Sequence, residues 1–549
     1  MNNITMIYIG IAIALLSIAK PANAFISSDI EERIRQKVEL IDTNPKIKFD
    51  NEAIFATYYL PQFYINRSFQ TAWLEKRSLK PSSIRLIDFI TMADREGLNP
   101  RDYHLDKINA MKMSLEKGTI SSDELVNLEL LLTDAYLTLA AHIIAGKVNP
   151  ENVTPEWKAQ KRNVEIKLDN YLAEAIHNNK VAESLTSLAP KFKSYERLKA
   201  KLKSLYALKA AGGWPTVMSG EKLEDGMRND RVRMLRERLE SDSYLDVNVD
   251  NRDFFDAKLK SAVIEFQRDH GLLDDGIAGV ATVAALNVSI DNRIDQIKVN
   301  MERCRWLSDD LGEKHLLINI AAFELNLIEN GNVTFNAKAI VGRTYRKTPV
   351  FSGSLSYIVL NPYWTIPSGI LKNDILPEVR KNVGYLAKKN IKVIDGKGNV
   401  VNPSSVDWQS PSAASYMFRQ DPGKDNALGL VKFMFPNSYS VYIHDTPSKE
   451  LFESSERAFS SGCIRVQKPL ELASFLLIGQ DDWTLDKILG STANPKTPET
   501  IYLTKPVPVH IVYFTSYYDL KTGKIRFLKD VYDRDKAVSD SLKSVPAKI

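Results

Sequence analysis

A cysteine and an upstream histidine form the clearest chemical pattern in the sequence. Cys463 follows the small residues 460–462, which allow a tight turn and a close approach of substrate to the thiol. His444 ends the strand-like run 439–444, and the segment between the two residues is long enough to bring imidazole and thiol together. A thiol with a pKa of about 8.5 is mostly protonated at neutral pH, and a nearby histidine makes a usable thiolate. The pattern predicts acyl transfer with Cys463 as nucleophile and His444 as base.

The residues beside this pair have expected roles of their own. The backbone N–H groups of the loop residues Ser461 and Gly462 and of Cys463 are candidates for an oxyanion hole. The ring of His444 needs an acceptor for its second nitrogen. Asp445 is adjacent in sequence, but neighbouring strand residues point to opposite faces, so a backbone carbonyl could serve instead. The sequence assigns no triad.

The remaining cysteine and the histidines indicate neither a disulfide scaffold nor a metal site. The chain has two cysteines and seven histidines. One bridge is arithmetically possible, but Cys304 lies on a predicted helix and is expected to be a packing residue. The histidines show no metal-ligand spacing, so no metal and no other cofactor is expected.

Length, charge and composition bound the class of protein. A chain of 549 residues favours two or three domains, and 44% hydrophobic with 26% charged residues is typical of a soluble globular protein. The net charge of +5 and the pI near 8.7, spread over 62.0 kDa, are too weak to indicate nucleic-acid binding.

The N-terminus predicts export. Residues 7–19 are mostly apolar, and Ala22, Asn23 and Ala24 follow in an A-x-A pattern, so residues 1–24 are expected to be a signal peptide cleaved after Ala24. Residues 1–6 contain no Lys or Arg, unlike most signal peptides. The alternative is an uncleaved anchor, although the apolar stretch is shorter than the about 20 residues of a membrane span.

Residues 25–225 predict a helical scaffold domain. Ser121 and Glu124 fit a capping box before the apolar run 125–144, which Gly146 ends. Further helices of this domain are expected over 83–96 and 193–208, and two helices of the module that follows it over 231–239 and 255–269.

Residues 226–290 resemble a known module. The segment FDAKLKSAVIEFQRDHGLLDDGIAGVATVAALN, with its F-Q, H-G-L, D-G, G-x-x-T and L-N elements, is similar to the three-helix peptidoglycan-binding module of cell-wall enzymes. The resemblance implies a small helical core that could bind the wall. A connecting helix is expected over 291–313.

From residue 314 the hydrophobic period becomes strand-like, which predicts a β-rich domain over 314–530. Residues 329–331 are a turn signal between two strands. The domain is interrupted at 367–422 by helix-like and polar segments, which we interpret as a helical capping insertion beside the active site; a surface decoration is the alternative. Residues 531–549 are expected to be a C-terminal tail. The fold class is therefore multidomain α+β.

The motif around Cys463 resembles the signature of the L,D-transpeptidases. That signature runs His, fourteen to seventeen residues, Ser or Thr, His, Gly, Cys, any residue and often Arg. Fifteen residues separate His444 from Ser460 here, and Ser461 stands where most of the family has His. The Ser-Ser-Gly-Cys form and the domain order resemble the large periplasmic branch of the family. Because Ser461 replaces a histidine, His444 is left as the base within the motif.

The resemblance implies a specific reaction. Cys463 attacks the L-centre carbonyl of the third residue, diaminopimelate, in a donor tetrapeptide stem and releases D-Ala; the side-chain amine of a second stem resolves the thioester as a 3–3 crosslink. Arg465 is expected to orient a substrate carboxylate or to brace the loop. Tyr442 and Trp364 are expected to be walls of the donor site or core residues. Carbapenems are implied as covalent inhibitors, and glycan polymerases and D,D-carboxypeptidases as partners.

Three alternatives remain open on the sequence. Water could resolve the thioester, making the protein an L,D-carboxypeptidase, or the same chemistry could attach a protein to peptidoglycan. The third alternative, a non-catalytic wall-binding scaffold, needs neither His444 nor Cys463.

Overall fold

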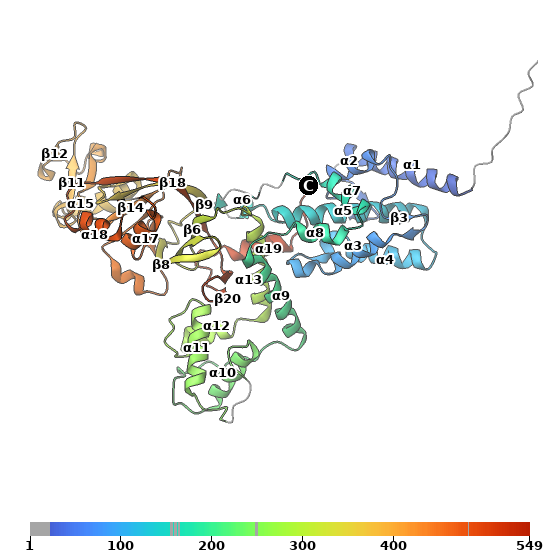
Figure 1. The fold of residues 1–549 in the computed structure, drawn as a ribbon, viewed down its shortest axis with the longest axis horizontal. Helices are drawn as coiled ribbons and strands as arrows, with labels where there is room; N and C mark the ends of the chain where they lie inside the picture. Colours follow the sequence, from blue (N-terminus) through green and yellow to red (C-terminus); the bar gives the residue numbers. More distant parts are fainter. Residues whose placement is uncertain are drawn as a thin grey trace, which may run out of the picture.

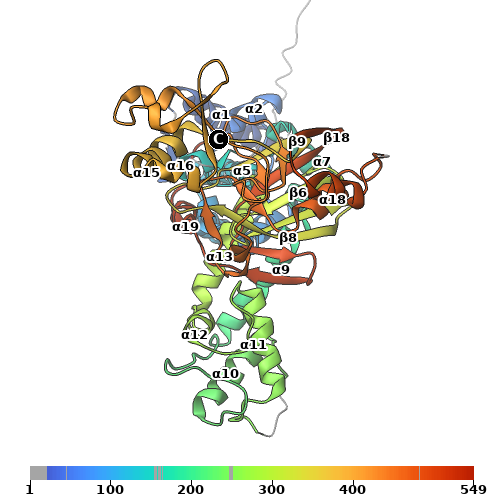
Figure 2. The same cartoon turned by 90° about the vertical axis from the view of Figure 1, so that its left-hand side faces the viewer.

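The computed structural model describes residues 22–44, 46–153, 157–158, 162, 165–246, 251–480 and 482–549. A helical N-terminal domain lies at one end, a sheet-rich domain at the other, and a small helical module projects between them (Figure 1). The view turned by 90° shows the module extending away from both (Figure 2). This arrangement confirms the expected multidomain α+β class. Residues 1–21, most of the expected signal peptide, lie outside the described residues.

Helix α5 (Ser122–Ala145) is the centre of the N-terminal domain. The predicted capping box is present, since Ser121 Oγ accepts the Glu124 N–H and the Glu124 carboxylate accepts the Ser121 N–H. By length and composition this helix could cross a membrane, but 89% of its apolar window is buried inside the protein. It is therefore a core helix.

Shorter helices bury their apolar faces around α5. They are α1 (Ala22–Thr43), α2 (Tyr59–Asn66), α3 (Pro81–Thr91), α4 (Leu105–Glu116), α7 (Leu168–His177) and α8 (Val181–Ser187). The helix expected over 83–96 is in fact two pieces, because α3 ends at Thr91 and a 3-10 turn spans Ala93–Glu96. The tighter turn brings the Glu96 carboxylate to the Tyr195 hydroxyl, 2.8 Å away.

A buried ionic triad holds this domain together. The ring of His104 lies between the carboxylates of Glu52 and Asp134, with both N–O distances 2.8 Å. The other oxygen of Asp134 accepts the N–H groups of Phe55 and Ala56 at 2.9 and 2.7 Å. Burial by itself lowers the pKa of His104, but its hydrogen bonds to the two carboxylates raise it to about 9. The histidine is therefore a buried cation between two anions.

The triad predicts pH-dependent stability. The folded pKa of His104 lies above the unfolded value of 6.5, so its contribution is complete below pH 6.5 and is lost as pH rises through about 9. We expect His104→Leu to lower the free energy of unfolding on the order of 2–3 kcal/mol at pH 6, and by clearly less at pH 9.5. Urea unfolding of the full chain at both pH values measures this, with the exposed His177→Leu as control. An equal loss at both pH values would contradict a charged triad.

The projecting module consists of α10 (Asp230–Ser241), α11 (Ala257–Asp269) and α12 (Val280–Leu286) around a core of its own. Gln267 organises the turn after α11. Its side-chain amide contacts the Asp275 carboxylate, the Ile277 carbonyl, the Thr282 hydroxyl and the Gly276 N–H. The F-Q, D-G and G-x-x-T elements of the sequence thus build the module's own turn.

Helices α9 (Lys193–Ala210) and α13 (Ile290–Arg305) pack against each other between the three bodies. Cys304 is buried in this contact, and burial raises the pKa of its thiol to about 12. Neither Cys304 nor Cys463 forms a disulfide. Cys304 is thus the packing residue that the sequence predicts.

The β-rich domain is a sheet closed on itself. Eight strands follow one another in the order β14-β15-β17-β8-β7-β6-β18-β9, and β9 pairs again with β14. They are β6 (Lys314–Asn319), β7 (Glu324–Glu329), β8 (Asn332–Gly342), β9 (Val350–Leu360), β14 (Val431–Met434), β15 (Ile443–His444), β17 (Ile464–Val466) and β18 (Glu499–Val512). The largest apolar cluster of the described chain fills the inside. Trp157 and Lys158 add strand β5 beside β9.

The capping insertion is a mixture of helices and sheet, not only helices as expected. Its short helices are α14 (Ser368–Ile370), the π-helical η3 (Leu371–Ile375), α15 (Leu376–Lys381) and α16 (Gly384–Lys388). A separate sheet of β10 (Trp364–Thr365), β13 (Met417–Gln420), β11 (Ile391–Ile394) and β12 (Val400–Val401) covers them. The sheet forms because three of the four residues 391–394 are β-branched and apolar, and because Asp395 closes the next turn by accepting two backbone N–H groups.

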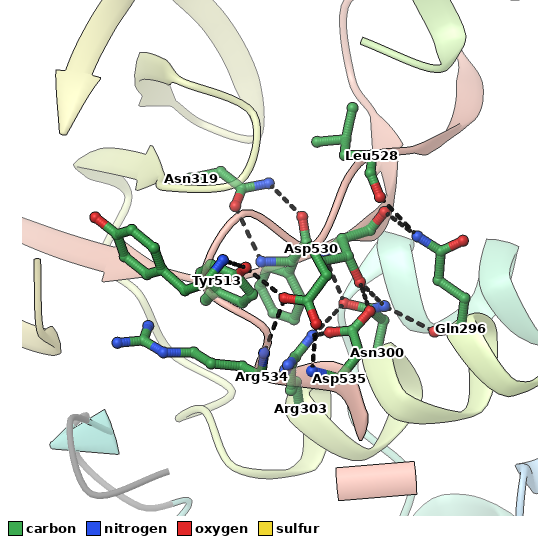
Figure 3. A network of polar contacts seen from close by, with 12 residues as sticks. Gln296, Asn300, Arg303, Asn319, Tyr513, Leu528, Asp530, Arg534 and Asp535 are labelled. Carbon is green, nitrogen blue, oxygen red and sulfur yellow. Dashed lines mark hydrogen bonds and ion pairs between the residues drawn. The ribbon is translucent and has the colours of Figure 1, made fainter. Parts of the chain in front are cut away.

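A polar network fastens α13 to the β-rich domain (Figure 3). Asn300 exchanges two hydrogen bonds with Thr515, at 2.8 and 2.9 Å. The Asp535 carboxylate accepts from Thr515 and from Arg303, both at 2.6 Å. Helix α19 (Asp535–Lys543), which begins in this network, leads to residue 549, whose backbone pairs with Phe55 of the N-terminal domain. The segment expected as a tail thus contacts both end domains.

Candidate active site

Two short parallel strands bring the predicted catalytic residues together. In β15 and β17, Ile443 pairs with Ile464 and His444 with Arg465. Both isoleucines are buried in the core. Since side chains alternate along a strand, the residues before and after each isoleucine face outward together. Cys463 therefore stands beside Tyr442 and diagonally from His444.

These outward side chains line one cleft of about 420 Å³. Cys463, His444, Tyr442 and Arg465 come from the two strands, Ser461 from the loop, and Trp364 from the start of the insertion. The insertion also contributes Pro367, Gly369, Ile370 and Asn373. Of the residues expected to act in catalysis, in the loop or in substrate binding, Gly462 alone is not among those lining this cleft.

A backbone carbonyl orients the His444 ring. The ring is buried, and its Nδ1–H donates to the carbonyl of Asp445, which leaves Nε2 as the proton acceptor. The Asp445 carboxylate points elsewhere: it accepts the N–H groups of Leu430 and Thr446 and pairs with Lys449. Burial and, after it, the charge of Arg465 lower the pKa of His444 to about 3. The imidazole is therefore neutral at neutral pH, with Nε2 unprotonated.

The Cys463 thiol lies in a partly buried, hydrogen-bonded position. Burial raises its pKa, while the backbone N–H and hydroxyl of Tyr442 lower it. Its Sγ donates to the Ser440 carbonyl at 3.7 Å. The Tyr442 hydroxyl also interacts with Trp364, so a chain of contacts runs from the indole to the thiol. Tyr442 thus touches the nucleophile directly.

The loop before Cys463 is tightly bonded. Ser460 Oγ donates to the Cys463 carbonyl at 2.5 Å and accepts the Gly462 N–H at 3.0 Å. Thr348 Oγ1 donates to the Gly462 carbonyl at 2.9 Å. The φ of Gly462 is +118°, a region that favours glycine. An oxyanion role for the Gly462 N–H requires its bond to Ser460 to open, whereas the Cys463 N–H has no partner among the described residues.

Lys432 is a site residue that sequence reasoning missed. It lies on β14 directly opposite His444, with Nζ 4.0 Å from the centre of the Tyr442 ring. Burial lowers its pKa, and its charge lowers the pKa values of both Cys463 and His444. Its place in the alternating run 431–434 was a signal, but the sequence does not reveal that this strand pairs with β15.

Arg346 is the second residue that was missed. It follows β8, and its guanidinium contacts both Ser461 and Asp374 of the insertion.

Among the described residues, no group of three or more His, Cys, Asp or Glu side chains is arranged to hold a metal ion.

The model of the L,D-transpeptidase catalytic domain family matches residues 313–503, which include every site residue described above. This part of the chain is similar to the catalytic domain of the L,D-transpeptidases. A model described as a "Putative peptidoglycan binding domain" matches 228–286, and one of a Scaffold domain matches 59–202. The three matches follow one another along the chain in the order scaffold, putative peptidoglycan-binding domain and L,D-transpeptidase catalytic domain.

Known proteins resemble parts of this chain. A curated "Putative L,D-transpeptidase" of Haemophilus influenzae is 34% identical over 249 residues, which cover 45% of this chain and 50% of the relative. The chain thus spans about half the length of that relative. The crystal structure of L,D-transpeptidase (Yku) from Stackebrandtia nassauensis is 12% identical, covering 54% of this chain and 96% of that chain, with a TM-score of 0.21. Mycobacterium tuberculosis L,D-transpeptidase 1 is 12% identical, covering 36% and 61%, with a TM-score of 0.14.

Removing the Lys432 charge is expected to make the thiol less acidic. In Lys432→Met the pH midpoint for alkylation of Cys463 by iodoacetamide should move upward, and the rate at pH 7 should fall roughly fivefold, since a nearby charge in a half-exposed site is worth about 1 kcal/mol or more. Lys432→Arg should restore the wild-type profile. A Met variant with an unchanged profile would show that the ammonium does not act on the thiol.

Gly429 is expected to be essential for the placement of Asp445. Its φ is +62°, and a Cβ there would overlap the Asp445 carboxylate. Gly429→Ala should therefore displace the carbonyl that orients His444 and slow turnover about 10- to 100-fold. Gly331 is a matched control, because its φ is +77° and its Cβ would meet nothing within 4 Å. Equal activity of the two alanine variants would argue against this positioning role.

Proposed function

We propose that this protein is an L,D-transpeptidase that forms 3–3 crosslinks in peptidoglycan through a thioester on Cys463. The observation that supports the proposal is the His444 ring, whose Nδ1–H is held by the Asp445 carbonyl so that Nε2 is left to accept a proton in the cleft of Cys463. A wall-binding scaffold needs no such pair. The match of this domain to L,D-transpeptidases supports the same reaction class.

In the first half-reaction, His444 Nε2 takes the thiol proton as Sγ attacks the carbonyl carbon of the third residue of the donor stem. The C–N bond to D-Ala breaks, and the imidazolium returns the proton to the leaving amine. Because Arg465 and burial disfavour an imidazolium, the proton is passed on readily. The product is a thioester on Cys463 and free D-Ala.

In the second half-reaction, the side-chain amine of a second stem attacks the thioester carbonyl. His444 removes a proton from this amine, and Cys463 leaves as a thiolate and is reprotonated by the imidazolium. A new amide bond joins the third residues of the two stems. Attack by water would instead make the protein an L,D-carboxypeptidase.

The other cleft residues support these steps. Tyr442 holds the thiol through its hydroxyl and forms, with Trp364, one wall of the donor site. Arg465 lies directly opposite His444, where its charge helps to keep the imidazole neutral. Ser461 and Gly462 shape the loop, and the Cys463 N–H is the amide free to meet an oxyanion.

The proposal also assigns a location and partners. Peptidoglycan stem peptides are the substrates, which requires an extracytoplasmic site, and residues 1–24 would direct the chain to the periplasm. The module matched at 228–286 would hold glycan near the cleft. Glycan polymerases and D,D-carboxypeptidases would supply the tetrapeptide donor, and carbapenems would acylate Cys463.

Mass spectrometry of purified tetrapeptide muropeptides after incubation with the full chain tests the reaction. We expect a product with two joined stems and one D-Ala lost, and a carbapenem adduct on Cys463. Cys463→Ala should abolish both, and His444→Ala should slow turnover at least about 100-fold. Cys304→Ala is the matched cysteine control and should retain activity.

The other outcomes separate the alternatives. Tripeptide without joined stems would establish the carboxypeptidase. Neither turnover nor an adduct would favour the non-catalytic scaffold.

A further inference from the structure

Arg346 connects the two walls of the catalytic cleft. Its guanidinium forms two parallel hydrogen bonds to the Asp374 carboxylate of η3, at 2.6 and 3.0 Å, and a third to Ser461 Oγ at 3.0 Å. Ser461 lies two residues before the nucleophile. One side chain thus touches both the insertion and the catalytic loop.

The position of Arg346 is set by the loop that carries it. The Arg343 N–H donates to the Ser460 carbonyl at 3.0 Å, and the Arg346 N–H donates to the Arg343 carbonyl at 2.9 Å. On the other side of Arg346, Thr348 holds the Gly462 carbonyl. The backbone that carries Arg346 is therefore fixed relative to Cys463 by bonds that do not involve the insertion.

The positive charge of the cleft favours an anionic ligand. Arg346 and Arg465 line it, Lys432 lies behind Tyr442, and no Asp or Glu is among the described residues that line it. Arg465 flanks the buried His444, whereas the Arg346 side chain is 22% exposed and lies at the rim. Arginine forks bind carboxylates with two parallel bonds, as Arg346 does with Asp374.

The bond to Asp374 is one that a ligand can replace. The Asp374 side chain is 41% exposed, and ion pairs at this exposure contribute little net stability. A carboxylate on a substrate bound in the cleft would meet the same guanidinium at close range. The pair is therefore suited to exchange one carboxylate for another.

Building on the proposed function, we propose that Arg346 binds a carboxylate of the donor stem and that Asp374 occupies this position in the free enzyme. Donor binding then replaces Asp374 and releases the hold of the insertion on the catalytic loop. The donor offers two carboxylates, one on the terminal D-Ala and one on the side chain of the third residue.

Equilibrium binding measures this without turnover. In the Cys463→Ala background, isothermal titration with the free tetrapeptide donor should show affinity reduced about 10- to 100-fold by Arg346→Gln and less by Arg346→Lys. Two further donors, each amidated at one of the two carboxylates, identify the group that Arg346 binds. The donor whose bound carboxylate has been amidated should have low affinity, and Arg346→Gln should not lower that affinity further.

Asp374→Asn removes the competing carboxylate and should tighten donor binding a few-fold. Asp421→Asn is the matched control, because Asp421 belongs to the same insertion but pairs with Lys392 and Arg419 away from the cleft, and it should leave affinity unchanged.

Two results would overturn the inference. One is an unchanged donor affinity in Arg346→Gln, and the other is an equal loss of affinity in this variant for the unmodified donor and for both amidated donors. A failure of the proposed function would give a different result. The donor would still bind in a way that depends on Arg346, but the enzyme with Cys463 intact would not turn it over. Iodoacetamide has no carboxylate. The rate at which it labels Cys463 should therefore be the same in Arg346→Gln as in the parent chain.

Discussion

The active site depends on the parallel pairing of β15 and β17. These strands are very short, yet Ile443 and Ile464 anchor both in the closed sheet and leave the alternate positions facing outward. Base and nucleophile are thereby fixed on one surface without a long strand between them. The Ser460–Gly462 bonds and the Thr348 hydroxyl then hold the turn that presents the thiol.

The electrostatics of the site favour a neutral Cys463 thiol and a neutral His444 imidazole in the free enzyme. Burial raises the pKa of the Cys463 thiol and lowers that of the His444 imidazole, so the thiol and the imidazole both remain uncharged at neutral pH. Lys432 and Arg465 favour negative charge that develops on sulfur or on a substrate oxygen. The same cations disfavour a lasting imidazolium, which helps the ring to give its proton to a leaving group.

The helical parts of the chain are attached to this domain by buried polar bonds. Asn300 and Arg303 of α13 meet Thr515 and Asp535 in one network (Figure 3). Helix α19 continues from it to the pairing of residue 549 with Phe55. Helices α13 and α19 therefore link the helical parts of the chain to the catalytic domain, since α13 contacts α9, α5 and β19 (Ser516–Asp519) and α19 contacts α13 and α6 (Pro150–Val153).

The sequence by itself determined the elements whose signals are local. The capping box at Ser121, the turn at 329–331 and the small residues before Cys463 depend on neighbours in the chain, so their chemistry could be recognised without a fold. Cys463 and His444 could also be recognised from the sequence as one candidate site, because their residue types and their spacing together are unusual. These signals were sufficient for the fold class and for the two residues at the centre of the proposed mechanism.

Only the tertiary structure decided which distant side chains join that pair. Lys432 meets His444 because β14 pairs with β15, and Arg346 reaches Ser461 because β8 lies beside β17. The choice of the Asp445 carbonyl over its carboxylate, and the sheet within the capping insertion, likewise follow from packing and hydrogen bonding. Strand order and register arise from contacts between segments far apart in the chain, and a single sequence contains no local signal for them.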